Sequence, residues 1–433
     1  MWRWGAAVAA GLLATLVVVF LSGCIPDVIV ILTDDQRPET LAAMPTVQAE
    51  LVGKGITFTQ LIAPTPVCEP SRATLLTGRL ASHHGVQWVA PPHGGAPLFV
   101  GPDATTLATE LQGHGYATGL FGKYLNSYDL QGPPYAPSWY IPPGWQRWRA
   151  FRTPRYFDYD VVQENGTTVH RGSAAADYST DVVKAEVTAW LTTIPTTQGV
   201  FAWVAPFGPH QGVGYMPEPA PRHVGTFAGI APWRPASFNE ADISDKPAWL
   251  QGFGLLDPGT IGYVDSFRQA QFEAVQAIDD LVAGIIATQK ARKRYGQTVI
   301  VFLSDNGIGW GEHRRVVVKG TAFEHDVVVP LVVRAATLTP RVESAMISEL
   351  DLLPSVLGGL GYPIPAGLDG VDFSGLLAGP GPGRATAPLE GFWGAAGMYT
   401  GVRTPTVTDV IYGTGEHEHY DRVADPDELV SQP

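Results

Sequence analysis

The most chemically suggestive stretch of the sequence is residues 68–79, CEPSRATLLTGR. Cysteine can act as a nucleophile, and Cys68 directly precedes a stretch of helix-forming residues that contains Arg72. Pro70 disfavours a helical conformation in the residue before it, so we expect the helix to begin after Cys68 with Ser71 as its N-cap. The free N–H groups at a helix N-terminus, together with Arg72, favour an anion. This stretch predicts a nucleophile facing an anionic substrate; the alternative is a buried structural cysteine.

Oxygen-donor side chains follow two of the apolar, β-branched runs in the sequence. Asp34 and Asp35 end the first run, and Asp305 and Asn306 end a later one. In an open α/β sheet the C-terminal strand ends lie along one edge, where ligands bind. Adjacent carboxylates repel each other there unless something neutralises them, although a solvated acidic turn is an equally common explanation of such a pair. Because the protein supplies every oxygen donor, we predict one divalent cation, Ca²⁺ in preference to Mg²⁺.

Four basic residues stand in comparable positions. Lys123 and His210 each follow a predicted strand, whereas His313 and Lys319 lie in the segment before another. Taken singly, such a lysine is usually solvated, and such a histidine is often a cap. The net charge of the chain is −13, so any anion site must be local, and Arg72 and these lysines are its best candidates.

Continuous apolar runs predict strands that are buried on both faces. They cover residues 27–33, 116–121, 199–204, 298–303 and 329–333. Amphipathic stretches predict helices over residues 106–113, 178–191 and 265–290. Strands that alternate with helices indicate an α/β fold with a mostly parallel central sheet sandwiched by helices. Residues 213–260, rich in Pro, Gly and aromatic side chains, are expected to form a long loop over the site.

The composition is that of a globular protein with a sizeable core. Of the 433 residues, 45% are hydrophobic and 16% are charged. The negative net charge and the lack of a Lys/Arg cluster argue against nucleic acid as a partner. Cys24 and Cys68 are the only cysteines, so we predict no disulfide framework.

The N-terminus has the pattern of an export signal. Arg3 is followed by the apolar run 5–21 and by Leu-Ser-Gly-Cys ending at Cys24, which resembles a bacterial lipobox. We therefore predict a signal peptide of the lipoprotein type over residues 1–23 and a lipid anchor at Cys24 that holds the exported protein on the membrane at the surface of a bacterium. The alternative is an uncleaved signal anchor.

Several blocks of the sequence together resemble the type I sulfatases, whose active-site signature is similar to residues 68–79. The blocks are LTDDQ at 32–36, CEPSR at 68–72, GKYLN at 122–126, APFGPH at 205–210, DNG at 305–307 and KGTAFE at 319–324. The resemblance covers roughly residues 26–430. It implies an alkaline-phosphatase-like catalytic domain over residues 26–380 and a small C-terminal α+β subdomain with an antiparallel sheet over residues 381–433.

The resemblance also implies the cofactors. In this family the signature cysteine, here Cys68, is oxidised by a formylglycine-generating enzyme to formylglycine (3-oxoalanine), whose hydrate is the nucleophile. The cation would be bound by residue 68 and by the four oxygen-donor residues, which are Asp34, Asp35, Asp305 and Asn306.

Roles for the basic residues follow in the same way. Arg72, Lys123 and Lys319 would contact the sulfate, and His210 would protonate the leaving oxygen. His313 is a weaker candidate for an acid or base. The sequence departs from the family at Leu125, where many members have a histidine.

The function implied is hydrolysis of sulfate monoesters, with a sulfated small molecule or glycan as substrate. The form of the GKYLN block is typical of glucosamine-6-sulfatase-like members and favours 6-O-sulfated amino sugars. One alternative is a phosphodiesterase or phosphonate monoester hydrolase of the same superfamily. Another is a surface lipoprotein that binds glycans without turnover.

Overall fold

The computed structural model describes residues 25–432. The predicted signal peptide over residues 1–23 and the lipidation site Cys24 lie outside this range. In the described part, no helix is both long enough and apolar enough to cross a membrane.

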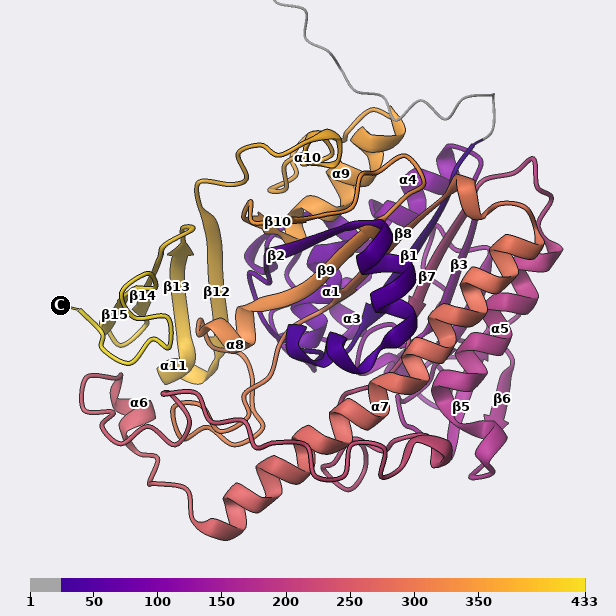
Figure 1. Ribbon diagram of the computed structural model, residues 1–433. Coiled ribbons are helices and arrows are strands. Elements are labelled where there is room, and N and C mark those ends of the chain that lie inside the picture. The colour runs from indigo at the N-terminus through magenta and orange to yellow at the C-terminus, as the bar shows by residue number, and fades with distance from the viewer. Residues whose placement is uncertain (1–24, 433) are drawn as a thin grey trace, which may run out of the picture.

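A large mixed sheet forms the centre of the molecule (Figure 1). Its strand order is β10-β2-β9-β8-β1-β7-β3-β4-β5-β6, with β11 beside β2. The strands are β1 (Asp27–Thr33), β2 (Ile56–Ile62), β3 (Ala117–Gly122), β4 (Arg147–Phe151), β5 (Tyr159–Gln163), β6 (Thr168–Arg171), β7 (Val200–Ala205), β8 (Thr298–Ser304), β9 (Val328–Arg334), β10 (Arg341–Glu343) and β11 (Ile347–Ser348). From β8 through β1, β7 and β3 to β4 all neighbours are parallel, as predicted, whereas β9, β5 and β6 pair antiparallel.

Helices cover both faces of this sheet because its central strands are apolar on both sides. In β1, Ile29 and Ile31 point into one core, and Val28, Val30 and Leu32 point into the other. The first core is closed by α5 (Ser179–Thr193) and α7 (Pro258–Ala291). The second core is closed by α1 (Cys68–Thr77), α4 (Leu107–Gly113) and α9 (Leu352–Leu360). The predicted α/β sandwich is confirmed.

Helix α7 is longer than the amphipathic pattern over 265–290 predicted. It begins at Pro258, inside the segment that was expected to be loop. Asp257 caps it by accepting hydrogen bonds from the N–H groups of Gly259 and Thr260, at 2.8 and 3.1 Å. Proline at the first helical position loses no hydrogen bond, so residues that look like a loop start the helix.

The remaining α-helices of the described residues are short, with four residues each. They are α2 (Ala81–His84), α3 (Ala96–Phe99), α6 (Ala248–Gln251), α8 (Glu324–Val327), α10 (Gly375–Ala378) and α11 (Gly394–Gly397). Apart from α6 and a turn at Pro221–His223, residues 213–257 form the long connection predicted from their composition.

The C-terminal region forms a separate antiparallel sheet, seen at the left of Figure 1. Its strands, in order, are β12 (Ala387–Trp393), β13 (Met398–Arg403), β14 (Val407–Tyr412) and β15 (His417–Asp421). Apolar side chains of β12 to β14 pack on the chain around α8 and β11. The predicted small C-terminal sheet is confirmed, and the boundary between residues 380 and 381 stays a prediction.

The packing of α7 leads to a stability prediction. Leu281 is fully buried in the core between α7 and the sheet, whereas Leu255 is 63% exposed. We expect Leu281→Ala to lower the free energy of unfolding by about 2–5 kcal/mol, because it removes buried methyl groups and leaves a cavity. The control Leu255→Ala makes the same chemical change and should cost less than about 0.5 kcal/mol. Urea unfolding measures both; equal losses would contradict this packing.

Candidate active site

Cys68 lies in the first turn of helix α1 and is almost fully buried, with 1% of its surface exposed. The helix begins at Cys68 itself, so the prediction that Ser71 is the N-cap is wrong. The Ser71 hydroxyl instead donates to the carboxylate of Glu349 at 2.9 Å. Pro70 is tolerated because the N–H groups of the first turn have no partner within the helix. The thiol therefore lies at the positive end of the α1 dipole.

The acidic residues meet because β1 and β8 are parallel neighbours. Thr33 pairs with Ser304 at the ends of these strands, so the residues that follow them lie side by side. The Asp35 N–H donates to the Asp305 carboxylate at 3.2 Å, and the Asn306 amide donates to Asp35 at 2.6 Å. Asp35 has a φ of 61°, a left-handed conformation that a short polar residue tolerates.

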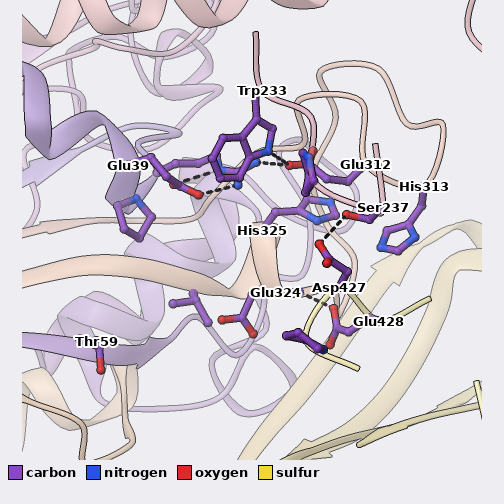
Figure 2. A pocket seen from close by; sticks show the side chains of 15 residues that line it. Glu39, Thr59, Trp233, Ser237, Glu312, His313, Glu324, His325, Asp427 and Glu428 are labelled. Carbon is purple, nitrogen blue, oxygen red and sulfur yellow. Dashed lines mark hydrogen bonds and ion pairs between the residues drawn. The ribbon is translucent and has the colours of Figure 1, made fainter. Parts of the chain in front are cut away.

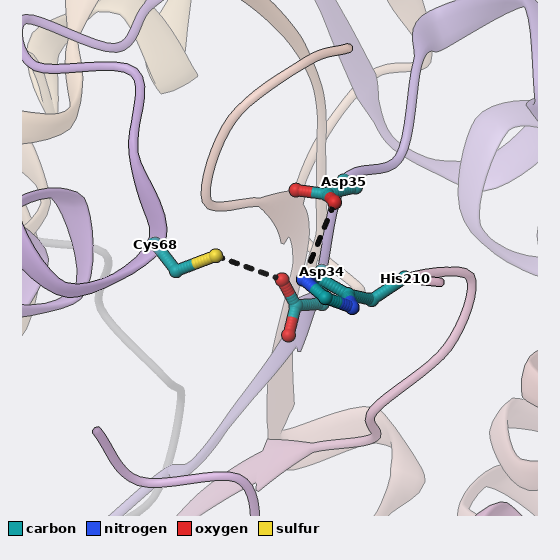
Figure 3. A group of neighbouring side chains, drawn as sticks. All are labelled: Asp34, Asp35, Cys68 and His210. Carbon is teal, nitrogen blue, oxygen red and sulfur yellow. Dashed lines mark hydrogen bonds and ion pairs between the residues drawn. The ribbon is translucent and has the colours of Figure 1, made fainter. Parts of the chain in front are cut away.

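Figure 3 shows how Cys68 and His210 lie around Asp34 and Asp35. The Cys68 Sγ donates to Asp34 Oδ1 at 3.3 Å, and His210 Nε2 lies 3.6 Å from Asp35 Oδ2. One ligand atom from each of the four residues lies within 4.8 Å of the others. Side chains from the residues that follow β1, from α1 and from the loop after β7 thus converge on one point.

Three basic side chains neutralise the carboxylates. Arg72 Nε donates to Asp305 at 2.7 Å, and Lys123 Nζ donates to Asp34 at 2.5 Å. Lys319 Nζ donates to Asp35 and lies 2.7 Å from the Cys68 sulfur. The predicted anion contacts Arg72, Lys123 and Lys319 therefore all surround residue 68.

The position of Lys123 depends on a close approach of two strands. Gly122 ends β3 with a φ of 107°, and a Cβ atom there would lie 2.0 Å from the Ala205 carbonyl oxygen of β7. The Lys123 N–H donates to that same oxygen at 2.7 Å. Only glycine fits at residue 122, and it turns the chain so that Lys123 points into the site.

The carboxylates differ in their ionisation because they share this space. Burial by itself would raise the pKa of Asp34, but the charges of Lys123, His210 and Arg72 outweigh it and hold that pKa well below its usual value. Burial and the charge of Asp34 raise the pKa of Asp305 to about 7. Burial, with the charge of Asp34, also raises the pKa of Cys68 well above its usual value. The acidic group thus has too little positive charge for every member to ionise.

The donor set fits a hard divalent cation. Asn306 Oδ1 is buried without a hydrogen-bond partner next to the carboxylates. An orphaned amide oxygen is costly unless it binds something positive, and three carboxylates together with an amide oxygen are ligands that Ca²⁺ and Mg²⁺ prefer. A cation at this point would also supply the charge that Asp305 lacks.

His210 holds a defined tautomer. Its Nδ1–H donates to the Gln211 carbonyl oxygen at 2.7 Å, which leaves Nε2 facing Asp35 and the interior of the site. Burial lowers the pKa of His210 from its ordinary value, although Asp35 and Asp34 oppose this effect. The nitrogen that faces the site can therefore exchange a proton with a bound group.

The structure does not bring His313 into this group. Its Nδ1 lies 2.6 Å from Glu240, and its ring stacks on Phe323. His313 lines a different cavity, whose volume is about 390 Å³ and whose lining does not include Cys68. Figure 2 shows it there with Trp233 and Glu312. Burial lowers the pKa of His313 to about 3, so its imidazole is neutral at ordinary pH.

Leu125 stands where many type I sulfatases, which the sequence resembles, have a histidine. It is buried in the second core near Tyr124 and Tyr128, so this position contributes packing and no proton transfer. The departure from the family at Leu125 is thus accommodated by the core.

Gln271 is a site residue that the sequence interpretation missed. It is fully buried on α7, and its amide donates to the Asp35 carbonyl oxygen at 3.1 Å and to the Pro209 carbonyl oxygen at 3.4 Å. Its own oxygen accepts from Trp310 Nε1 at 2.6 Å. A glutamine on the apolar side of an amphipathic helix was the available signal, because a buried amide needs polar partners.

Comparison with known proteins shows the family to which this chain belongs. The family model described as Sulfatase matches residues 26–362, about three quarters of the chain. The chain belongs to the sulfatase family.

Three relatives illustrate the range of this family. The sulfatase chain is 28% identical to an arylsulfatase of Volvox carteri, over 93% of this chain and 71% of the relative. It is 28% identical to a putative extracellular sulfatase Sulf-1 homolog of Caenorhabditis elegans, over 81% and 49%. It is 28% identical to the human N-acetylglucosamine-6-sulfatase, over 82% and 64%. The chain thus spans about half to two thirds of the length of the last two relatives.

Solved structures share the fold. A protein solved in complex with its substrate D-glucosamine-2-N,6-O-disulfate aligns with a TM-score of 0.77 and 20% identity, over 94% of this chain and 93% of that one. A phosphonate monoester hydrolase of Agrobacterium radiobacter aligns with a TM-score of 0.73 and 22% identity, over 94% and 91%. These likenesses confirm the alkaline-phosphatase-like architecture expected from the sequence.

The contacts of Gln271 lead to a prediction. Gln271→Leu should lower the free energy of unfolding by about 1–3 kcal/mol, because it leaves the Trp310 N–H and the Asp35 carbonyl without partners. Because Gln271 holds the backbone of Asp35, the variant should also weaken cation binding, which Ca²⁺ titration measures. The control Gln276→Leu, on a more exposed part of the same helix, should change neither quantity appreciably. Equal Ca²⁺ affinity in both variants would contradict a positioning role.

Proposed function

We propose that this sulfatase-family chain hydrolyses sulfate monoesters at the site around residue 68. The observation that carries the proposal is the convergence of Arg72, Lys123 and Lys319 on a helix N-terminus that also faces a set of oxygen donors. A sulfate ester is an anion with three oxygens for such donors to bind. Hydrolysis breaks the bond between sulfur and the bridging oxygen, and the products are sulfate and an alcohol.

In this proposal one divalent cation is held by Asp34, Asp35, Asp305, Asn306 and residue 68. Such a cation would supply Lewis-acid chemistry toward a sulfate oxygen when bound. It also gives the carboxylates another positive partner. With a cation bound to these carboxylates, Lys123 and Lys319, which contact Asp34 and Asp35 in the structure, would be available to bind the substrate anion.

We further propose that Cys68 is converted to formylglycine before the protein acts. The support is the CEPSR signature and the position of residue 68 between Asp34 and Lys319. The hydrated aldehyde supplies a hydroxyl nucleophile on the side chain. A formylglycine-generating enzyme is then a partner during maturation.

Side chains of the protein would stabilise the transition state and transfer the proton. Arg72, Lys123 and Lys319 stabilise the negative charge that shifts onto the sulfate oxygens in the transition state. His210, protonated at Nε2, gives a proton to the leaving alcohol oxygen. The hydrogen bond from its Nδ1–H to Gln211 keeps the ring oriented for that transfer. His313 contacts Glu240 and lies outside the group around residue 68, so no step of this proposal uses it.

For the substrate we propose 6-O-sulfated amino sugars. The support is the GKYLN block, the similarity to N-acetylglucosamine-6-sulfatase, and the shared fold with the protein solved with a disulfated glucosamine. The second candidate function, phosphonate monoester hydrolysis, is favoured by the fold shared with the Agrobacterium enzyme. A protein that only binds glycans would have no use for a nucleophile position surrounded by basic side chains and His210.

We also propose that the protein is exported and, through Cys24, anchored in the membrane at the cell surface. The support is the lipobox-like pattern before Cys24 and the extracellular sulfatases among the relatives. The lipid anchor and a bacterial host rest on the sequence pattern alone.

The modification at residue 68 has a direct test. Mass spectrometry of the peptide that spans residues 68–79 from active protein should show a mass lower than that of the cysteine form by the difference between thiol and aldehyde. Cys68→Ala should lose sulfate release. A fully active preparation with an intact thiol at Cys68 would refute the formylglycine proposal.

The anion site is tested with a panel of substrates. The purified protein should release sulfate from 6-sulfated glucosamine and from an aryl sulfate, with a lower kcat/KM for a phosphonate ester. Lys123→Met should reduce kcat/KM for the sulfates at least about 100-fold, because it removes a buried charge that stabilises the transition state. The control Lys290→Met makes the same change at an exposed position and should leave kcat/KM for the sulfates unchanged. Normal turnover by Lys123→Met would remove Lys123 from the site, and a preference for phosphonates would favour the second candidate.

A further inference from the structure

A second group of ligand-type side chains lies far from residue 68 in the sequence, on the C-terminal sheet. It consists of Asp409 on β14 and of His417 and His419 on β15. One ligand atom from each lies within 4.8 Å of the others. In the part of the chain that the structure describes, the site at Cys68 is the other group with this property.

The strand pairing explains why these three side chains meet. Side chains two residues apart point to the same face of a strand, so His417 and His419 share a face of β15. Asp409 lies directly opposite His419 in the antiparallel register. The neighbours Val410 and Glu418 point to the opposite, buried face. The group therefore projects from the outer face of the hairpin, with 31–40% of each side chain exposed.

The distances fit a shared metal ion. His417 Nε2 lies 3.2 Å from one oxygen of Asp409, and His419 Nδ1 lies 2.8 Å from the other. Zinc binds nitrogen and oxygen ligands at about 2.0–2.2 Å in a tetrahedron, which places neighbouring ligand atoms about 3.3 Å apart. The two His–Asp distances lie near that separation, and all three ligand atoms lie within 4.8 Å of one another.

The chemistry of the group also differs from an ordinary ion pair. One carboxylate accepts from two imidazoles at once, with a different carboxylate oxygen facing each ring. Other His–Asp contacts in the described chain, such as His170 with Asp160, contain a single imidazole. Two imidazoles with one carboxylate form a donor set typical of Zn²⁺ and of neighbouring transition metals.

We propose that Asp409, His417 and His419 form a surface site for one transition-metal ion of the Zn²⁺ type, with water completing the coordination. The site is separate from the oxygen-rich site at Asp34, and its imidazoles select a softer ion than Ca²⁺. An ion bound there joins β15, the last strand of the C-terminal sheet, to β14 (Figure 1). Metal binding therefore stabilises the fold of this sheet.

The test uses the purified full chain, freed of metal with a chelator and then dialysed against excess Ca²⁺ to occupy the oxygen-rich site. Isothermal titration with Zn²⁺ should detect one equivalent per chain, and Zn²⁺ should raise the Tm. The double variant His417→Ala/His419→Ala should lose that equivalent and the rise in Tm. The matched control His170→Ala, which removes an exposed strand histidine paired with aspartate, should keep both.

A second variant covers the case in which the double variant does not fold. Asp409→Asn retains the shape of the side chain and should weaken Zn²⁺ binding at least about tenfold, because it removes the charged ligand. Zn²⁺ binding with the same stoichiometry and affinity in Asp409→Asn and in the unaltered chain would overturn the proposal. The absence of a Zn²⁺ equivalent in the unaltered chain would overturn it as well.

Discussion

The structure depends on the neutralisation of buried charge at one edge of the central sheet. Asp34, Asp35 and Asp305 are taken out of water there, which is unfavourable unless each meets a positive group. Arg72, Lys123 and Lys319 supply these groups from α1, from the end of β3 and from the loop before β9. These contacts between acidic and basic side chains hold separated elements of the fold together at one point. The pKa of Asp305 is nevertheless raised, because the nearby positive charge does not fully offset its burial and the charge of Asp34.

The parallel strands are what make this convergence available. Because β1, β8, β7 and β3 run in the same direction, the residues that follow them all arrive at the same edge. Burial of the apolar interior of each strand offsets the cost of burying the charged groups at its end. Gly122 shows how tightly the strand ends approach, since a side chain there would collide with the neighbouring backbone.

The two groups of ligand-type side chains differ in their donor atoms and in their burial. The sheet edge around residue 68 carries carboxylate and amide oxygens that are buried and balanced by basic side chains, a donor set that hard ions prefer. The C-terminal sheet presents imidazoles on an exposed face, where each strand contributes alternate side chains. Burial and donor type therefore separate the two places, although both arise from the simple geometry of strand ends and strand faces.

The sequence by itself determined the α/β class, because apolar runs and amphipathic stretches alternate, and it identified Cys68, Asp34 and Lys123, because each stands in a short contiguous block. It could not determine contacts between residues that lie far apart in the chain. Only the tertiary structure decided that Gln271 holds the backbone of Asp35 and that His313 pairs with Glu240 away from the site. The physical reason is that local pattern sets which side chains are buried, whereas strand order and helix packing set which of them meet.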